Sequence, residues 1–251
     1  MIQKCTRRKS ILQSRVCTFG FVFFTISLNS AYSVCLPDSV RDKQDAYQFV
    51  RAETQALVRA QSALERIPPE QSPPTTVEEL IGQVTATLVG LKEAREEFAC
   101  AAKIIAPFRL SNDGVIAKSS EAFRAVYSAL ANLEDQLIQN TQETLKGKSG
   151  LSDLGSTIQW RADMTVKFDN MWEALGNGTA LSMNALVLPG QVGRLKITES
   201  QRKDLIREID DGFGDAVKAG PQKDQSGPTL AAALIRAFLV NPDWKSKDGT
   251  E

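Results

Sequence analysis

The chain has 251 residues with 30 basic and 30 acidic side chains, and it contains no histidine. A chain without histidine cannot build a Ser-His-Asp triad, an HExxH zinc site or the usual haem ligation. The phosphate-binding patterns GxxxxGK[ST] and GxGxxG and the nucleophile pattern GxSxG do not occur either. We therefore predict no catalytic residue, no metal site and no cofactor.

The first 33 residues have the three parts of a secretory signal. Five basic residues and no acid precede an apolar run from Val16 to Leu28, and a stretch of small and polar residues ends at Ser33. The run is shorter than the roughly 20 residues that span a bilayer. We predict a cleaved signal peptide at 1–33 rather than a signal anchor, no membrane span after cleavage, and a periplasmic or secreted location.

Cleavage after Ser33 leaves 25 basic and 30 acidic residues, a net charge near −5. This balance argues against a general nucleic-acid or anionic-membrane binder. Only Cys35 and Cys100 remain in the exported chain, and an oxidising compartment favours a disulfide between them. Two unpaired thiols are the alternative. With the pair bridged, a cysteine nucleophile is not expected.

Apolar residues recur in steps of three and four, which predicts four long amphipathic helices. Their stripes run over 47–67, 77–105, 116–137 and 151–175. Pro68 and Pro69 end the first helix. Thr75 and Thr76 both have capping-box spacing at the start of the second. Gly176-Asn177-Gly178 is expected to interrupt the fourth, with a resumption from Ala180 to Leu188 left open.

Two shorter helices are predicted after the fourth. One begins at Thr198, which has capping-box spacing to Gln201, and the other runs from Leu230 to Leu239. The fold class is all-α: an antiparallel bundle of about four long helices with two shorter C-terminal helices. A pair of separate helical hairpins is the alternative. The predicted domains are the signal peptide at 1–33, the helical bundle at 34–188 and a C-terminal helical appendage at 189–251.

The segment Ile197-Thr198-Glu199-Ser200-Gln201 is similar to the LTxxQ motif of periplasmic stress chaperones of the Spy and CpxP type. Those proteins are also small, exported and helical. The resemblance covers five residues, with Ile in place of Leu, and this chain has one such motif where the family shows two. A helix N-cap explains the threonine and the glutamine equally well, so the family's function is not carried over.

Polar residues interrupt the apolar stripes at similar heights in three helices. Counted from the predicted turns, Gln61, Asn140 and Arg161 fall within roughly 8 Å of one level, and Trp160 adjoins them. The favoured interpretation is a Gln61–Asn140 layer that fixes the register, with Arg161 and Arg95 extending outward. The alternative is a ligand-binding site for a small anion or carboxylate, formed by Arg161, Gln61, Asn140 and Trp160.

Three functions remain in order of preference. The first is a non-catalytic interaction, scaffold or chaperone-like module of the cell envelope, with a protein partner in the envelope or secreted space and no nucleic-acid partner. The second is a ligand-binding or sensing bundle that uses the level of Arg161. The third is an enzyme that works with carboxylates alone, which would have to come from different helices.

Overall fold

The computed structural model describes residues 35, 42–43, 45–67, 75–145, 154–187, 197–222, 225 and 227–241. Within these ranges the side chains of 77, 144–145, 154–162, 164–165 and 187 are excepted. The predicted signal peptide at 1–33 and the predicted domain boundary at 188–189 lie outside the described residues.

Six α-helices make up the described chain, and none of its residues forms a strand. The all-α prediction is confirmed, with four long and two shorter helices. The helices are α1 Ala46–Arg66, α2 Val77–Ile105, α3 Gly114–Leu145, α4 Leu154–Val187, α5 Glu199–Phe213 and α6 Gly227–Leu239. Two short 3-10 helices follow α2 and α5: η1 Ala106–Leu110 and η3 Gly214–Val217.

Side chains next to the helices cap their N-termini. The Asp45 carboxylate accepts a hydrogen bond from the Tyr47 backbone N–H at the start of α1. Thr76 forms the predicted capping box with Glu79 at the start of α2, and Thr198 forms one with Gln201 before α5. Each box satisfies backbone N–H groups that the first helical turn leaves without a partner. Local sequence therefore fixes where these helices begin.

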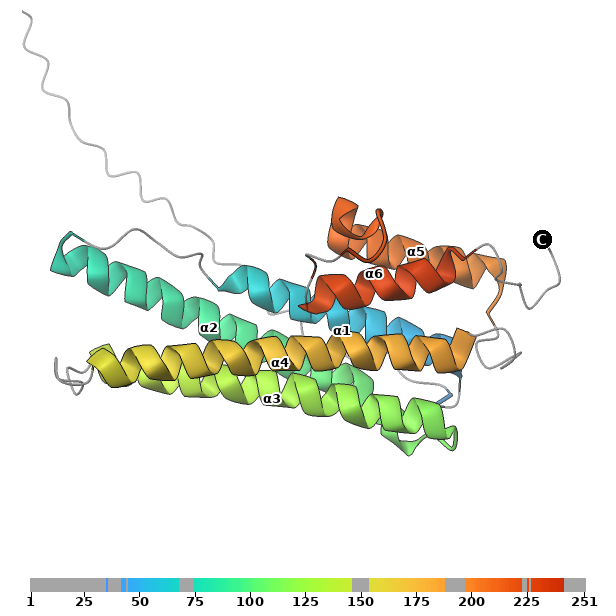
Figure 1. Ribbon diagram of the computed structural model, residues 1–251, viewed down its shortest axis with the longest axis horizontal. Helices are drawn as coiled ribbons and strands as arrows, with labels where there is room; N and C mark the ends of the chain where they lie inside the picture. Colours follow the sequence, from blue (N-terminus) through green and yellow to red (C-terminus); the bar gives the residue numbers. More distant parts are fainter. Residues whose placement is uncertain are drawn as a thin grey trace, which may run out of the picture. The chain divides into compact units, whose positions relative to one another are not determined.

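Helices α1, α2 and α3 pack as antiparallel neighbours (Figure 1). Arg59 and Arg66 of α1 pair with Glu97 and Glu93 of α2 in reversed order, as antiparallel chains require. The α2–α3 pair is joined near its turn, where the Ser120 hydroxyl donates to the Ile105 carbonyl oxygen over 2.7 Å. The predicted antiparallel bundle is confirmed for these helices.

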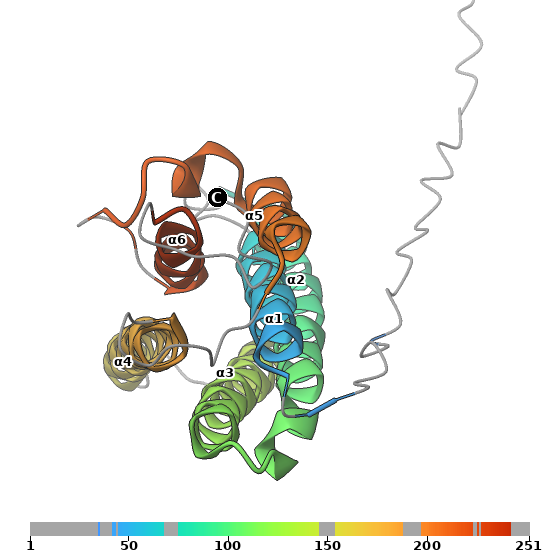
Figure 2. The same ribbon diagram turned by 90° about the vertical axis from the view of Figure 1, so that its right-hand side faces the viewer.

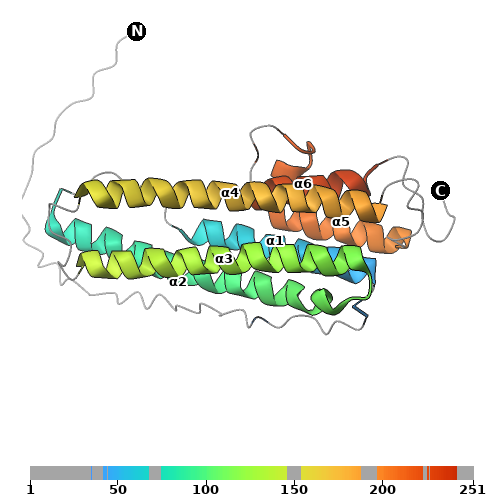
Figure 3. The same ribbon diagram turned by 60° about the horizontal axis from the view of Figure 1, so that its bottom comes forward.

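Helix α4 runs without a break from Leu154 to Val187 along α3 (Figure 3). The interruption predicted at Gly176-Asn177-Gly178 is wrong. A Cβ atom added at Gly178 would lie 2.9 Å from the Phe123 ring of α3, and one at Gly176 would lie 3.4 Å from Leu230 of α6. The two glycines allow close helix packing inside α4, so packing overrides their preference for turns.

Helix α6 packs against both α1 and α4, whereas α1 and α4 lie further apart and meet through side chains such as Glu53 and Thr179 (Figure 2). Three consecutive alanines, 231 to 233, are fully buried and let α6 approach closely. One hydrophobic core includes residues from all six helices, among them Phe49, Phe98, Phe123, Trp172, Leu205 and Ile235. The C-terminal helices therefore share the core of the long ones. No described helix has an apolar stretch long enough to cross a bilayer.

Candidate functional site

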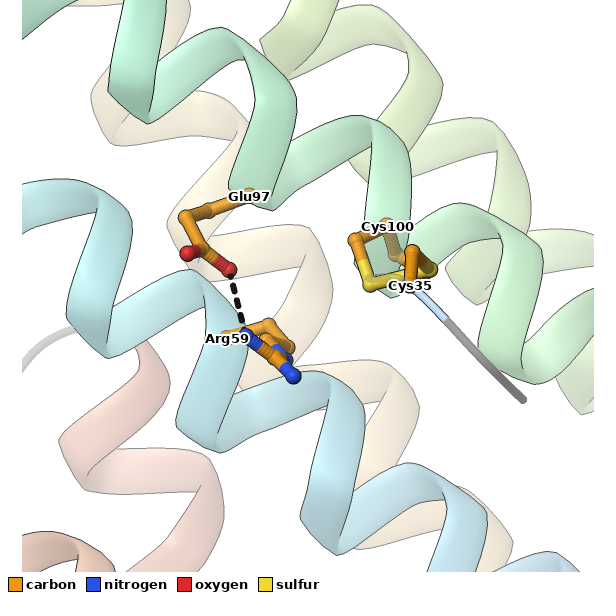
Figure 4. The surroundings of a disulfide bond; sticks show 4 residues. All are labelled: Cys35, Arg59, Glu97 and Cys100. Carbon is orange, nitrogen blue, oxygen red and sulfur yellow. Dashed lines mark hydrogen bonds and ion pairs between the residues drawn. A yellow bond between two sulfur atoms is a disulfide. The ribbon is translucent and has the colours of Figure 1, made fainter. Parts of the chain in front are cut away.

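The predicted disulfide between Cys35 and Cys100 is confirmed (Figure 4). Its Cα atoms are 5.5 Å apart, and it ties Cys35, eleven residues before the start of α1, to the second half of α2. Nearby, Arg59 of α1 pairs with Glu97 of α2 over 3.2 Å. The ion pair links α1 to the C-terminal half of α2, and the disulfide fastens the chain before α1 to the same part of α2.

The predicted ligand-binding residues are only partly described. Gln61 is half-buried on α1; its side-chain nitrogen donates to Glu65, and its side-chain oxygen accepts from the Thr229 hydroxyl of α6 over 3.3 Å. Asn140 is half-buried near the end of α3. Trp160 and Arg161 lie in α4, but their side chains fall outside the described residues.

Ion pairs between helices place the levels of these residues along the bundle. Arg59–Glu97 and Arg95–Asp135 align Gln61 of α1 with about residue 135 of α3. Asn140 lies about five residues further, or about 7.5 Å at the helical rise. Arg95 extends to the surface and pairs with Asp135 and Glu96, as the favoured interpretation expects. The ligand site at the Arg161 level remains a prediction.

A buried polar cluster that the sequence analysis missed lies between α1, α3 and α4. It contains Glu53 and Tyr127, both fully enclosed, and Thr179, whose hydroxyl donates to Glu53 Oε1 over 2.9 Å. Glu53 Oε2 and the Tyr127 hydroxyl have no hydrogen-bond partner among the described residues. Glu134, two turns beyond Tyr127 on α3, is also buried, and neither of its carboxyl oxygens has a described partner.

Burial shifts the acid–base behaviour of this cluster. Removal from water raises the pKa of Glu53 to about 8, and the hydrogen bond from Thr179 opposes that rise. Burial, helped by the nearby Asp135 charge, raises the pKa of Glu134 to about 7. The pKa of Tyr127 is raised well above its usual value by burial and by the charge of Glu53. At neutral pH Glu53 is mostly uncharged, which is the form a core tolerates.

The sequence itself indicates that Glu53 is buried. The apolar stripe of α1 steps from Val50 to Leu57, and Glu53 and Thr54 fill the gap on the same face. Both are buried, and the Thr54 hydroxyl donates a hydrogen bond to the Val50 carbonyl oxygen of the same helix. A charged residue at such a gap predicts either a partner on another helix or a neutralised carboxyl.

A second feature is the part of α2 that α1 does not cover. Because Arg66, the last residue of α1, pairs with Glu93, residues 77–90 of α2 extend past the end of α1 (Figure 1). No charged residue occurs from Leu80 to Leu91. Ile81 and Val89 are each 52% exposed within this uncharged stretch. We call the solvent-facing side of residues 78–92 the distal face of α2.

Comparison of the chain with protein-family models, with curated proteins and with solved structures finds no match. Two features of the described chain bear on its function: the buried Glu53 cluster and the distal face of α2.

Proposed function

We propose that this protein is a non-catalytic interaction module of the periplasm or secreted space, and that it binds another α-helix on the distal face of α2. The observation that carries the proposal is the uncharged stretch from Leu80 to Leu91, which presents Ile81 and Val89 to solvent where α1 has ended. Ile81 and Val89 lie about two turns apart on one side of α2, and exposed apolar side chains grouped on one helix face are typical of protein-binding surfaces. An amphipathic helix binds such a surface through residues spaced by three and four.

The exported location is part of the proposal. The Cys35–Cys100 disulfide supports it, since such bridges form and persist mainly in oxidising compartments. The predicted signal peptide at 1–33 agrees with the same location. Detection of the mature chain in the periplasm or medium, with Ser33 or an earlier residue as the last one removed, is the direct measurement. A chain retained in the cytoplasm with reduced cysteines would contradict it.

Site-specific photo-crosslinking tests the binding surface. A photo-crosslinking amino acid at Ile81 or Val89 should form products with a protein in the living source cells, whereas one at Ala122, exposed on α3, should not. An Ile81→Asp variant should lose the product formed from position 89 while keeping its helical signal and melting temperature, because Ile81 is exposed. Equal yields from positions 81, 89 and 122 would overturn the proposal.

A further inference from the structure

We propose that the helix bound on the distal face of α2 is the distal face of a second copy of this chain, in an antiparallel pair centred on Thr85. The inference rests on the proposed function and names its partner. Five residues carry the argument: Glu78, Ile81, Thr85, Val89 and Lys92. All five are exposed.

These residues lie on one side of α2. At 100° per residue they fall within about 80° of one another around the helix axis. They therefore form a single stripe that a neighbouring helix can contact along its length. Ile81, Thr85 and Val89 form the uncharged middle of the stripe, and the charged residues Glu78 and Lys92 lie at its two ends.

The spacing of the stripe is symmetric about Thr85. Ile81 and Val89 each lie four residues from it, and Glu78 and Lys92 each lie seven residues from it. In an antiparallel pair of identical helices with a two-fold axis at Thr85, each residue lies opposite the one at equal distance on the other side. Ile81 then contacts the Val89 of the second copy, and Glu78 lies opposite the second copy's Lys92.

The charges at the two ends are complementary in this arrangement only when the helices are antiparallel. In a parallel pair Glu78 would lie opposite Glu78, and Lys92 opposite Lys92, so like charges would repel at both ends. Neither Glu78 nor Lys92 forms an ion pair with any residue that the structure describes. Pairing with a second copy would place an opposite charge beside each of these two residues.

Small residues near the centre allow the helices to approach. Gly82 and Ala86 lie on one edge of the stripe beside Thr85 and are exposed, and a Cβ atom added at Gly82 would meet nothing within 4 Å. The contact is a single helix face, whereas stable protein interfaces bury roughly 1,200–2,000 Å². The dimer is therefore weak, with a dissociation constant expected in the micromolar range.

Charge exchange tests the pairing and its direction. Sedimentation equilibrium of the exported chain over about 1–500 µM should show a reversible monomer–dimer equilibrium. Glu78→Lys places two lysine–lysine contacts in the dimer, and Lys92→Glu places two glutamate–glutamate contacts, so each should weaken it by about tenfold or more. The double variant exchanges the charges at both ends and should restore the dimer to within about threefold of the original.

Lys103→Glu is the matched control. Lys103 is exposed on the same side of α2, but the opposite helix has ended at its level in the proposed register, so its reversal should leave the dimer unchanged. The inference is overturned if the original chain stays monomeric over the whole range, if the double variant is no better than the single ones, or if Lys103→Glu weakens the dimer equally. A monomeric chain that still forms crosslinks from Ile81 with a different protein would overturn the dimer and leave the proposed function standing.

Discussion

Glu53 is enclosed by helices on every side, and its pKa of about 8 links its protonation to folding. The folded protein holds this proton more tightly than the unfolded chain, in which a glutamate titrates near 4.5. The free energy of unfolding should therefore fall as the pH rises from about 4.5 to about 8, by on the order of a few kcal/mol, and level off above that. Chemical unfolding at about pH 5 and about pH 9 measures the change.

Glu53→Gln isolates this contribution. The amide keeps the hydrogen bond from Thr179 and cannot ionise, so the variant should lose the Glu53 part of the pH dependence. The pKa of Glu134 is also raised, to about 7, so Glu134 lowers the free energy of unfolding with rising pH in both proteins. Its contribution cancels when the two proteins are compared. The variant should gain stability relative to the original chain between the two pH values. A difference that does not change with pH would contradict the burial of a neutral Glu53.

Gly178 and Gly176 offer a matched pair of substitutions within α4. Gly178→Ala brings a methyl group to 2.9 Å from the ring of Phe123, which is itself held by stacking on Phe49. It should destabilise the protein by about 1–3 kcal/mol. Gly176→Ala meets Leu230 at an ordinary 3.4 Å and should be neutral or stabilise by up to about 1 kcal/mol through helix propensity. Thermal unfolding of both variants checks the difference, and equal effects would contradict it.

At the scale of the helices, features with a local cause were predictable from the sequence. Thr76 and Thr198 begin helices because their hydroxyls and the residues three positions later satisfy backbone groups. The glycines of α4 were misread because their packing against Phe123 and Leu230 involves residues more than 50 positions away. The place of α6 beside α1 and α4 is likewise set by contacts distant in sequence.

The two candidate sites were also predictable only in their local features. The uncharged stretch of α2 can be read in the sequence, but which of its residues face solvent is known only from the structure. Glu53 interrupts an apolar stripe visibly, yet its partner Thr179 lies on another helix. The level calculated for Gln61 and Asn140 depended on assumed turn positions, and the ion pairs place the two residues about 7.5 Å apart along the bundle, close to that calculation. Spacing along one helix is thus predictable, whereas the residue that a side chain meets on another helix is not.

Helix α6 provides the prediction at this scale. It is bound to α5 through Arg236, which donates to Asp210 over 2.7 Å, and its alanines are buried in the shared core. A chain that ends at residue 226 should expose Trp172 and Leu175 of α4. Trp172 packs against Gly227 of α6, and Trp172 and Leu175 both belong to the hydrophobic core that α6 shares. We expect binding of a hydrophobic dye, a broad thermal transition and a lower melting temperature. A truncated chain that unfolds as sharply as the full chain would show that α6 is an independent appendage.

For the molecule as a whole, the Cys35–Cys100 bridge closes a segment of 65 residues that contains α1 and most of α2. Limiting the conformations of the unfolded chain over a loop of this length stabilises the folded state by about 4 kcal/mol on the chain-entropy account. The variant Cys35→Ala/Cys100→Ala should lose stability by that order under oxidising conditions, and reduction should lower the melting temperature of the original chain but not of the variant. Since α1 is also held by Arg59–Glu97 and by a buried apolar face, the variant should keep its helical content at room temperature. Loss of that content would mean that α1 packs on α2 only when the bridge holds it there.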